Sequence, residues 1–531
     1  MSIPVSRPWR ARSALAAVAL GALALAACSS PSTSGSSSSG SSTAGSSGTA
    51  ASSSGGTLNL GDDQIAPSSY NPWDAGYGIN NTLWFSQVLY DSLVTLNGNA
   101  QPQPSIATAW TQNGNTTTLT LRSGVKFSDG TALDAAAVKA NLDYGAAHPS
   151  GAECNAYLAG LKTTVLSPTS IQLTTPKPVP GLLQDLGQCA GFIVSPKALA
   201  NPKSLVSTPD GSGPYTLQSS GTIAGQRYTF TKNPNYWNPS AFPFKTIVLT
   251  MFTSTTTVVN AVRGGQSDVA SNLSSSELAG IGSSVGQLSG TPDLLMGMWV
   301  ADTAGTLVKP LGNVLVRQAM NYAINRQALV TGLYKQTGVV AGSTPFPSFY
   351  AGYSSALASL YPYNPAKAKQ MLAQAGYPNG FSVNAIDSPA TATLAEAIAG
   401  YLAQVGIKVQ LNSYTTNFVT EMLTGKFPLI TGAYTLNAAQ FQTINGIVGP
   451  NGFWNPRHNT DAKVMGMLAT IQTAPTAQQA TLYDQLARQI ATDGLLLTPA
   501  IIQQITIYSS HVKATAVAGV PVPMVYDILP S

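Results

Sequence analysis

The chain has 531 residues, of which only 9 % are charged, and its 26 Lys and Arg side chains nearly balance its 21 Asp and Glu side chains. Nucleic-acid-binding domains carry basic patches or runs. The sequence has no such run, so we expect no nucleic-acid partner. The length is sufficient for two or more lobes, each with its own hydrophobic core.

The first 27 residues have the pattern of a secretory signal peptide. Arg7, Arg10 and Arg12 form a basic region, and residues 14–27 are an uncharged stretch rich in Ala and Leu. As a helix this stretch would span about 21 Å, which is short of the roughly 30 Å hydrocarbon core of a bilayer. The pattern therefore predicts a cleaved signal rather than a membrane span.

Residues 25–28, Leu-Ala-Ala-Cys, resemble the bacterial lipobox. The resemblance implies cleavage before Cys28 and attachment of lipid to its sulfur; the alternative is an ordinary signal peptide followed by a chance cysteine. Residues 28–56 then consist almost entirely of Ser, Gly, Thr and Ala after the cysteine. Such a segment buries too little apolar surface to fold, so it predicts a disordered linker. We expect an exported protein, held by its lipid at the outer face of the cytoplasmic membrane.

Two further cysteines, Cys154 and Cys189, lie in the body of the chain. In the oxidising environment of an exported protein, an even pair suggests a disulfide. The alternative is two buried free thiols.

The first half of the body contains clear local signals. Residues 116–122 alternate Thr with apolar side chains, which predicts a half-buried strand. Asp129 and Gly130 predict a turn, and Asp134 is placed to cap a helix that continues to Leu142. Farther on, Asn313 is expected to begin a helix and Asn325 to begin another.

The second half predicts the architecture. Asn364–Pro365 begins a predicted helix, which Gly376 ends because glycine adopts the left-handed conformation. A strand at 381–386, a helix at 394–405 and a strand at 407–411 follow with short connections. Such a unit requires a right-handed crossover between parallel strands. Parallel sheets are covered on both faces, so we expect an α/β lobe.

Several motifs together resemble those of the extracellular solute-binding proteins, family 5, which serve the peptide/nickel class of ABC importers. Each motif is weak by itself, but their order and spacing are those of the family. The chain departs from the pattern at Ala137, where an acidic residue is usual, and at Asn325, where Asp is usual. The matching segments are residues 71–72, 88–93, 106–110, 119–131, 211–215, 233–237, 316–326 and 366–377.

The resemblance implies a two-lobed, periplasmic-binding-protein-like α/β fold of the large peptide-binding type, with a subdomain inserted in lobe I. The lobes would close on the ligand about a hinge. It also implies permease and ATPase subunits of an ABC importer as partners, and contact with the membrane through the lipid anchor only. The implied boundaries are 57–94, 211–298 and 500–531 for lobe I, 95–210 for the inserted subdomain, and 299–499 for lobe II.

Aromatic side chains suit a cleft that covers a small organic solute, since they offer a large contact area for little rotamer entropy. Tyr77 aligns with a segment that lines the cleft in relatives, and Trp73 and Trp454 are further candidates. The alternative for all three is packing in a core.

The ligand class is predicted from one further segment. Peptide-binding relatives carry F-D-x-x-x-x-G-W-x-A-D, whose backbone pairs with the peptide and whose last Asp binds its α-ammonium. Here residues 427–437 match, with Tyr434 at the aromatic position, Thr435 after it and Asn437 in place of the Asp. An amide brings no charge to compensate a buried ammonium. The resemblance therefore predicts a neutral or N-blocked solute, unless the alignment slips and Glu421 or Asp461 serves as the acid.

The sequence predicts no enzyme, no cofactor and no metal. Its three histidines are far apart and follow no metal-binding spacing. Residues 123–126 and 510–513 match the Ser-x-x-Lys form of penicillin-binding enzymes, but the partner motifs of that class are missing. The alternatives to transport are a cell-wall-associated lipoprotein and, less favoured, a penicillin-binding-type hydrolase.

Overall fold

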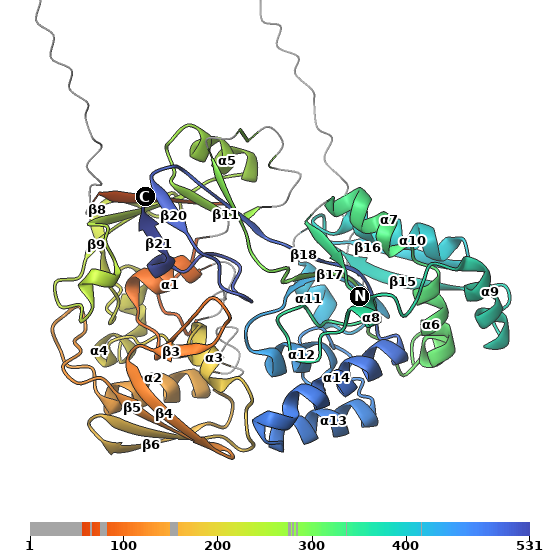
Figure 1. Cartoon of the computed structure of the whole chain (residues 1–531), viewed down its shortest axis with the longest axis horizontal. Coiled ribbons are helices and arrows are strands. Elements are labelled where there is room, and N and C mark those ends of the chain that lie inside the picture. The colour runs from red at the N-terminus through yellow and green to blue at the C-terminus, as the bar shows by residue number, and fades with distance from the viewer. Residues whose placement is uncertain are drawn as a thin grey trace, which may run out of the picture. The chain divides into compact units, whose positions relative to one another are not determined.

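The computed structural model describes residues 56–531 apart from 64–65, 75–81, 149–154, 156–157, 274–277, 279–280, 283–284, 336 and 416 (Figure 1). The predicted signal peptide, Cys28, nearly all of the predicted linker, Tyr77 and Cys154 lie outside the described residues. Within the described part of the chain, no helix combines the length and hydrophobicity that spanning a bilayer requires.

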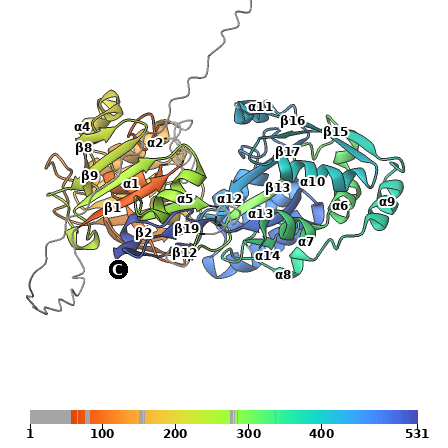
Figure 2. The same cartoon turned by 90° about the horizontal axis from the view of Figure 1, so that it is seen from above.

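The first lobe is built on a seven-stranded sheet with the order β12-β19-β11-β1-β10-β9-β8. Its strand β1 runs parallel to β10 and β11, and the other pairs are antiparallel. Helices α1 (Leu83–Leu89) and α5 (Thr255–Arg263) lie beside this sheet (Figure 2). The strands are β1 (Thr57–Asp62), β8 (Tyr215–Ile223), β9 (Arg227–Lys232), β10 (Thr246–Met251), β11 (Val269–Leu273), β12 (Gly286–Ser289) and β19 (Ile505–Tyr508).

Between β1 and β8 the chain forms a second, smaller sheet with the order β4-β5-β7-β6. The predicted strand is β5, and the predicted cap is present, because Asp134 accepts hydrogen bonds from the backbone N–H groups of Ala136 and Ala137. The helix runs past Leu142 to Ala147, about one and a half turns further. Gly145 in this extension lies against the side chains of Trp73 and Leu158. The elements are β2 (Val94–Leu96), β3 (Pro102–Pro104), β4 (Ala107–Asn113), β5 (Thr116–Leu121), α2 (Ala135–Ala147), β6 (Lys162–Ser167), β7 (Ser170–Thr174), α3 (Leu182–Leu186) and α4 (Pro196–Leu199).

The second lobe is built on a six-stranded sheet with the order β14-β18-β13-β17-β15-β16. Strands β15 and β16 are parallel, as predicted, and α10 connects them. The sheet as a whole is mixed, because β13 runs antiparallel to both of its neighbours. The strands are β13 (Leu294–Val300), β14 (Gly338–Val340), β15 (Phe381–Asp387), β16 (Ile407–Ser413), β17 (Leu429–Thr435) and β18 (Leu496–Ile502).

Helices cover both faces of this second sheet. Along β13, Met296 and Met298 face a core with α6, α9 and α10, whereas Leu295 and Trp299 face a core with α12, α13 and α14. The capping residues Asn313, Asn325 and Asn364 each accept a hydrogen bond from the first turn of the helix that follows them, as predicted. The helices are α6 (Val314–Tyr322), α7 (Arg326–Leu329), α8 (Ser355–Ala358), α9 (Pro365–Gln374), α10 (Ala392–Ala403), α11 (Phe418–Leu423), α12 (Gln440–Val448), α13 (Ala462–Thr473) and α14 (Thr476–Asp493).

The chain crosses between the two large sheets twice, from β12 to β13 and from β18 to β19. After β19 the chain ends with a small pair of strands, β20 (Val512–Ala514) and β21 (Ile528–Pro530). The family motif residues Tyr236 and Trp237 are structural: both donate hydrogen bonds to the buried carboxylate of Asp91, at 2.8 Å and 2.6 Å. They tie the loop after β9 to the segment after α1.

Candidate functional site

The segment predicted to contact ligand forms β17 and the turn that follows it. Strand β17 lies in the middle of the second sheet, where Thr435 pairs with Leu294 and Leu429 pairs with Val300. Its last residues therefore lie beside the start of β13, next to the crossing from the first lobe. Thr435 is buried, and Tyr434 is half-buried with its ring edge toward Trp454, 5.9 Å between centroids.

Asn437 is 2 % exposed and has a local structural role. Its Oδ1 accepts hydrogen bonds from the backbone N–H of Ala439 and the hydroxyl of Thr443, both at 2.9 Å. Its backbone carbonyl accepts a hydrogen bond of 2.5 Å from the hydroxyl of Tyr350. The acceptor end of this amide is thus already used in starting α12.

Residues of the first lobe contact this same region. Gln442 on α12 donates a 2.7 Å hydrogen bond to the carboxylate of Asp185 on α3, and both side chains are buried. Gly519, in the C-terminal segment, has φ +68° and lies so close that a Cβ there would be 2.6 Å from the backbone nitrogen of Ala438. Only glycine combines that conformation with that approach. The end of β17 and the start of α12 therefore lie where the two lobes meet.

A buried acid on the first crossing, Asp293, also borders this region, and no motif in the sequence predicted its role. The backbone carbonyl of Asp293 accepts a hydrogen bond from Leu436, and its carboxylate accepts one from Gln504 on the second crossing. Burial raises the pKa of Asp293 to about 7, while the bond from Gln504 acts in the opposite direction. The only sequence signal was a single acid directly before an apolar strand.

The two acids considered as substitutes for the missing Asp are engaged elsewhere. Glu421, on α11, forms an ion pair with Lys426. Asp461 caps α13 by accepting from the backbone N–H groups of Lys463 and Val464, at 2.8 Å and 2.9 Å.

The aromatic candidates have packing roles in the structure. Trp73 is 1 % exposed, and its Nε1 donates to Asn141 in the first lobe. Trp454 stacks on Trp299, with centroids 4.5 Å apart and planes 12° apart. Their roles toward a ligand stay predictions, as does that of Tyr77. The disulfide between Cys154 and Cys189 also stays a prediction, because Cys154 lies outside the described residues.

Within the described ranges, no group of three or more His, Cys, Asp and Glu side chains is placed to hold a metal ion. The polar groups near Asn437 are amides, hydroxyls and two buried carboxyl groups, those of Asp185 and Asp293. This arrangement can orient a polar solute by hydrogen bonds.

The fold defines the class of this protein, that of the two-lobed periplasmic binding proteins. Residues 101–448 match the model of the bacterial extracellular solute-binding proteins, family 5. The chain therefore belongs to this family, whose members are the extracytoplasmic solute-binding components of ABC importers.

Individual relatives agree with this assignment. The glutathione-binding protein GsiB of Salmonella paratyphi A is 30 % identical over 360 residues, which cover 65 % of this chain and 67 % of that protein. The binding protein AgaA of A. tumefaciens R10, in complex with agropinic acid, superposes with a TM-score of 0.75 at 22 % identity, covering 90 % of this chain and 99 % of its own. DppA of Helicobacter pylori, in complex with the peptide STSA, superposes with a TM-score of 0.74 at 22 % identity. The superposition covers 90 % of this chain and 98 % of DppA.

Proposed function

We propose that this protein binds a peptide-like or other small organic solute that lacks a free α-ammonium group, and delivers it to the permease and ATPase of its importer. A capped peptide or a glycan fragment has this chemistry. The observation that carries the proposal is Asn437, which the family resemblance places where peptide-binding relatives carry Asp. The relatives named above bind glutathione, agropinic acid and a peptide. Membership in the family therefore does not specify the ligand, and the ligand class has to be inferred from the residues of this chain.

The contacts of Asn437 support this ligand class. Its carbonyl oxygen already accepts two hydrogen bonds, so an ammonium would compete with Ala439 and Thr443 for it. An amide also brings no negative charge, and leaving one member of a buried charge pair alone costs about 3–5 kcal/mol. With its pKa raised to about 7, Asp293 carries only part of a charge at neutral pH. A ligand with a blocked or missing amine avoids this cost.

Calorimetry with a matched pair of tripeptides, one with a free amine and one N-acetylated, tests the ligand class. We expect the acetylated peptide to bind and the free peptide to bind at least about a hundredfold more weakly, since about 3 kcal/mol corresponds to that factor. Asn437→Asp is the matched variant, because Asp keeps an acceptor for Ala439 and Thr443 and adds the charge. It should reverse the preference. Tight binding of the free peptide alone, unchanged in Asn437→Ala, would contradict the proposal.

We also propose the finer location that the leader predicts, a lipid anchor at Cys28. Cys28→Ala should remove the lipid mass from the mature protein and release it into the medium, because the thioether to the lipid requires the cysteine sulfur. Ser30→Ala, two residues away, is the control and should stay in the membrane fraction. Mass spectrometry and fractionation of the native host measure both. Membrane retention of Cys28→Ala would end this part of the proposal.

The relatives are binding proteins rather than hydrolases, and we propose that this chain is likewise not an enzyme. Turnover of a β-lactam or a D-Ala peptide by the purified protein would favour the hydrolase instead.

A further inference from the structure

The second lobe contains a cavity of about 240 Å³ whose lining does not include Asn437, although Trp454 on its wall contacts Tyr434. The cavity lies beside Trp299, at the end of β13 opposite to Leu294, which pairs with Thr435. The five residue steps of strand from Leu294 to Trp299 span about 16–17 Å. All of the cavity's lining side chains belong to residues 299–496, so the cavity does not depend on closure of the lobes. Its volume is below the roughly 300–1,000 Å³ of typical ligand pockets, which indicates a small ligand. Its wall includes Trp299, Arg317, Val448, Trp454, Asp461 and Leu495.

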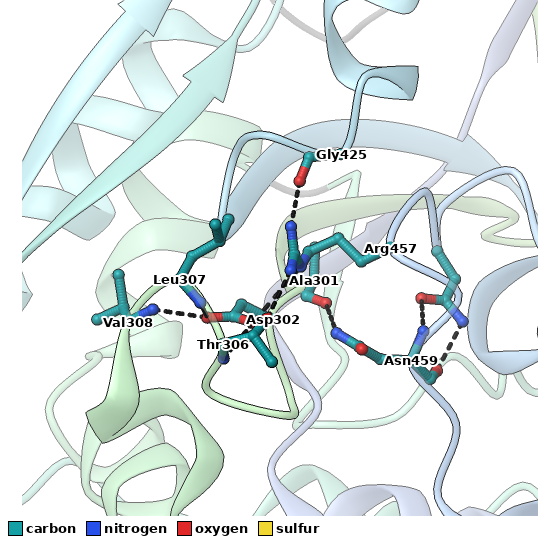
Figure 3. Close-up of polar contacts among 9 residues, drawn as sticks. Ala301, Asp302, Thr306, Leu307, Val308, Gly425, Arg457 and Asn459 are labelled. Atoms are coloured by element: carbon teal, nitrogen blue, oxygen red, sulfur yellow. Dashed lines mark hydrogen bonds and ion pairs between the residues drawn. The ribbon is translucent and has the colours of Figure 1, made fainter.

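The rim of this cavity is held by a dense polar network (Figure 3). Asp302 is fully buried and accepts hydrogen bonds from Thr306, Leu307 and Val308, at 2.7–3.0 Å. Arg457 lies 3.4 Å from the same carboxylate. Nearby, the side-chain amide of Asn459 donates to the backbone carbonyl of Ala301, at 2.7 Å. The loops that frame the cavity are thereby fixed before any ligand arrives.

The indole rings of Trp299 and Trp454 form part of the wall, stacked on each other. Their N–H groups are buried behind its surface, where an acceptor has no room, and they have no hydrogen-bond partner among the described residues. The two rings therefore contribute apolar surface to the cavity rather than donors.

Opposite charges also line this cavity without pairing with each other. Arg317 is 5 % exposed; its Nε donates to the carbonyl of Asp493 and its Nη1 to that of Leu311, both at 2.8 Å. Its Nη2 forms no hydrogen bond within the described part of the chain. Asp461 is exposed; it uses Oδ1 to cap α13, and its Oδ2 has no protein partner among the described residues. Burial lowers the pKa of Arg317, and the carboxylates of Asp493 and Asp461 oppose that shift.

We propose that this cavity is a second ligand site, selective for a small free amino acid with an apolar side chain. The carboxylate of the amino acid would accept from Nη2 of Arg317, and its ammonium would donate to Oδ2 of Asp461. The side chain would pack on Val448 and Leu495. A charge-assisted hydrogen bond at each end matches a zwitterion and disfavours a molecule with one end blocked. This selectivity is the reverse of that proposed at Asn437, so the two sites can be tested independently.

Titration calorimetry with L-leucine, N-acetyl-L-leucine and L-leucinamide tests the zwitterion requirement. We expect L-leucine to bind one site. L-leucinamide should bind roughly thirtyfold more weakly, because it loses the charged bond to the buried Arg317. N-acetyl-L-leucine should bind about fivefold more weakly, because Asp461 is exposed. Intrinsic fluorescence should change on binding, since two of the seven Trp residues form the wall. Equal affinity for all three compounds, or no binding of L-leucine at millimolar concentration, would overturn the proposal.

Two isosteric variants test whether L-leucine binds in this cavity. Asp461→Asn keeps the helix cap, because Asn and Asp cap equally well, but removes the charge; it should weaken L-leucine binding by about fivefold, because Asp461 is exposed. Asp134→Asn makes the same change at the cap of α2 in the first lobe, where Asp134 accepts in the same way, and should leave the affinity within about twofold. Equal loss in both variants, or no loss in Asp461→Asn, would show that L-leucine does not bind here.

Two more variants separate this site from the first one and from a folding defect. Thr460→Trp places a large side chain at an exposed position of the lining and should abolish L-leucine binding while leaving binding of the acetylated tripeptide. Asn437→Ala should leave L-leucine binding intact. If Thr460→Trp lost the tripeptide but kept L-leucine, the assignment of the two ligands to the two sites would be wrong.

Discussion

Replacing Asp302 by Ala should lower the free energy of unfolding of the second lobe by about 3–5 kcal/mol, the typical cost of breaking a buried charge pair. The carboxylate is fully buried and accepts from the backbone N–H groups of Thr306, Leu307 and Val308 as well as from the Thr306 hydroxyl. Without it these donors would lose their acceptor, and the guanidinium of Arg457 would lose its ion-pair partner. Urea unfolding followed by Trp fluorescence measures the loss.

Asp484→Ala is the matched control for Asp302→Ala. Asp484 pairs with Arg488 one turn later on α14, at 2.9 Å, but both side chains are substantially exposed. Exposed pairs of this kind contribute little to stability because water screens them, so this variant should unfold at nearly the same urea concentration as the wild type. Equal shifts in the two variants would show that burial of Asp302 does not govern its contribution.

The second large effect is expected at Gly432, in the middle of β17. A Cβ at this position would lie 2.4 Å and 2.5 Å from two ring carbons of Trp454. Gly432→Ala would push Trp454 off Trp299, which loses a stacking contact of about 0.5–1.5 kcal/mol and strains a packed core by about 1–3 kcal/mol. We expect the variant to be less stable by about 2–3 kcal/mol in the same urea experiment.

Gly466→Ala provides the control for Gly432→Ala, because it is the same chemical change in the same lobe. Gly466 lies within α13, and a Cβ there would have nothing within 4 Å. In an open helical position Ala is favoured over Gly by about 0.5–1 kcal/mol, so this variant should be more stable than the wild type. Two shifts of the same sign would contradict the packing argument for Gly432.

Local signals in the sequence predicted those parts of the fold that depend on neighbouring residues. The caps Asp134, Asn313 and Asn364 work within one turn of helix, so each could be recognised from a few letters. The parallel pair β15 and β16 followed from the short connections on either side of α10. The prediction did not extend to the antiparallel neighbours of β13, since their pairing joins residues more than a hundred positions apart.

For the site, the sequence by itself determined the family and the chemical character of position 437, because an amide lacks charge wherever it lies. Only the tertiary structure decided what that amide contacts, and that Asp293, Asp185 and Gln442 lie in the same region. The cavity beside Trp299 was also invisible in the sequence. Arg317 and Asp461 are 144 positions apart, and a sheet with helices on both faces brings them to one wall. Such contacts result from packing between elements, which no local pattern of residues encodes.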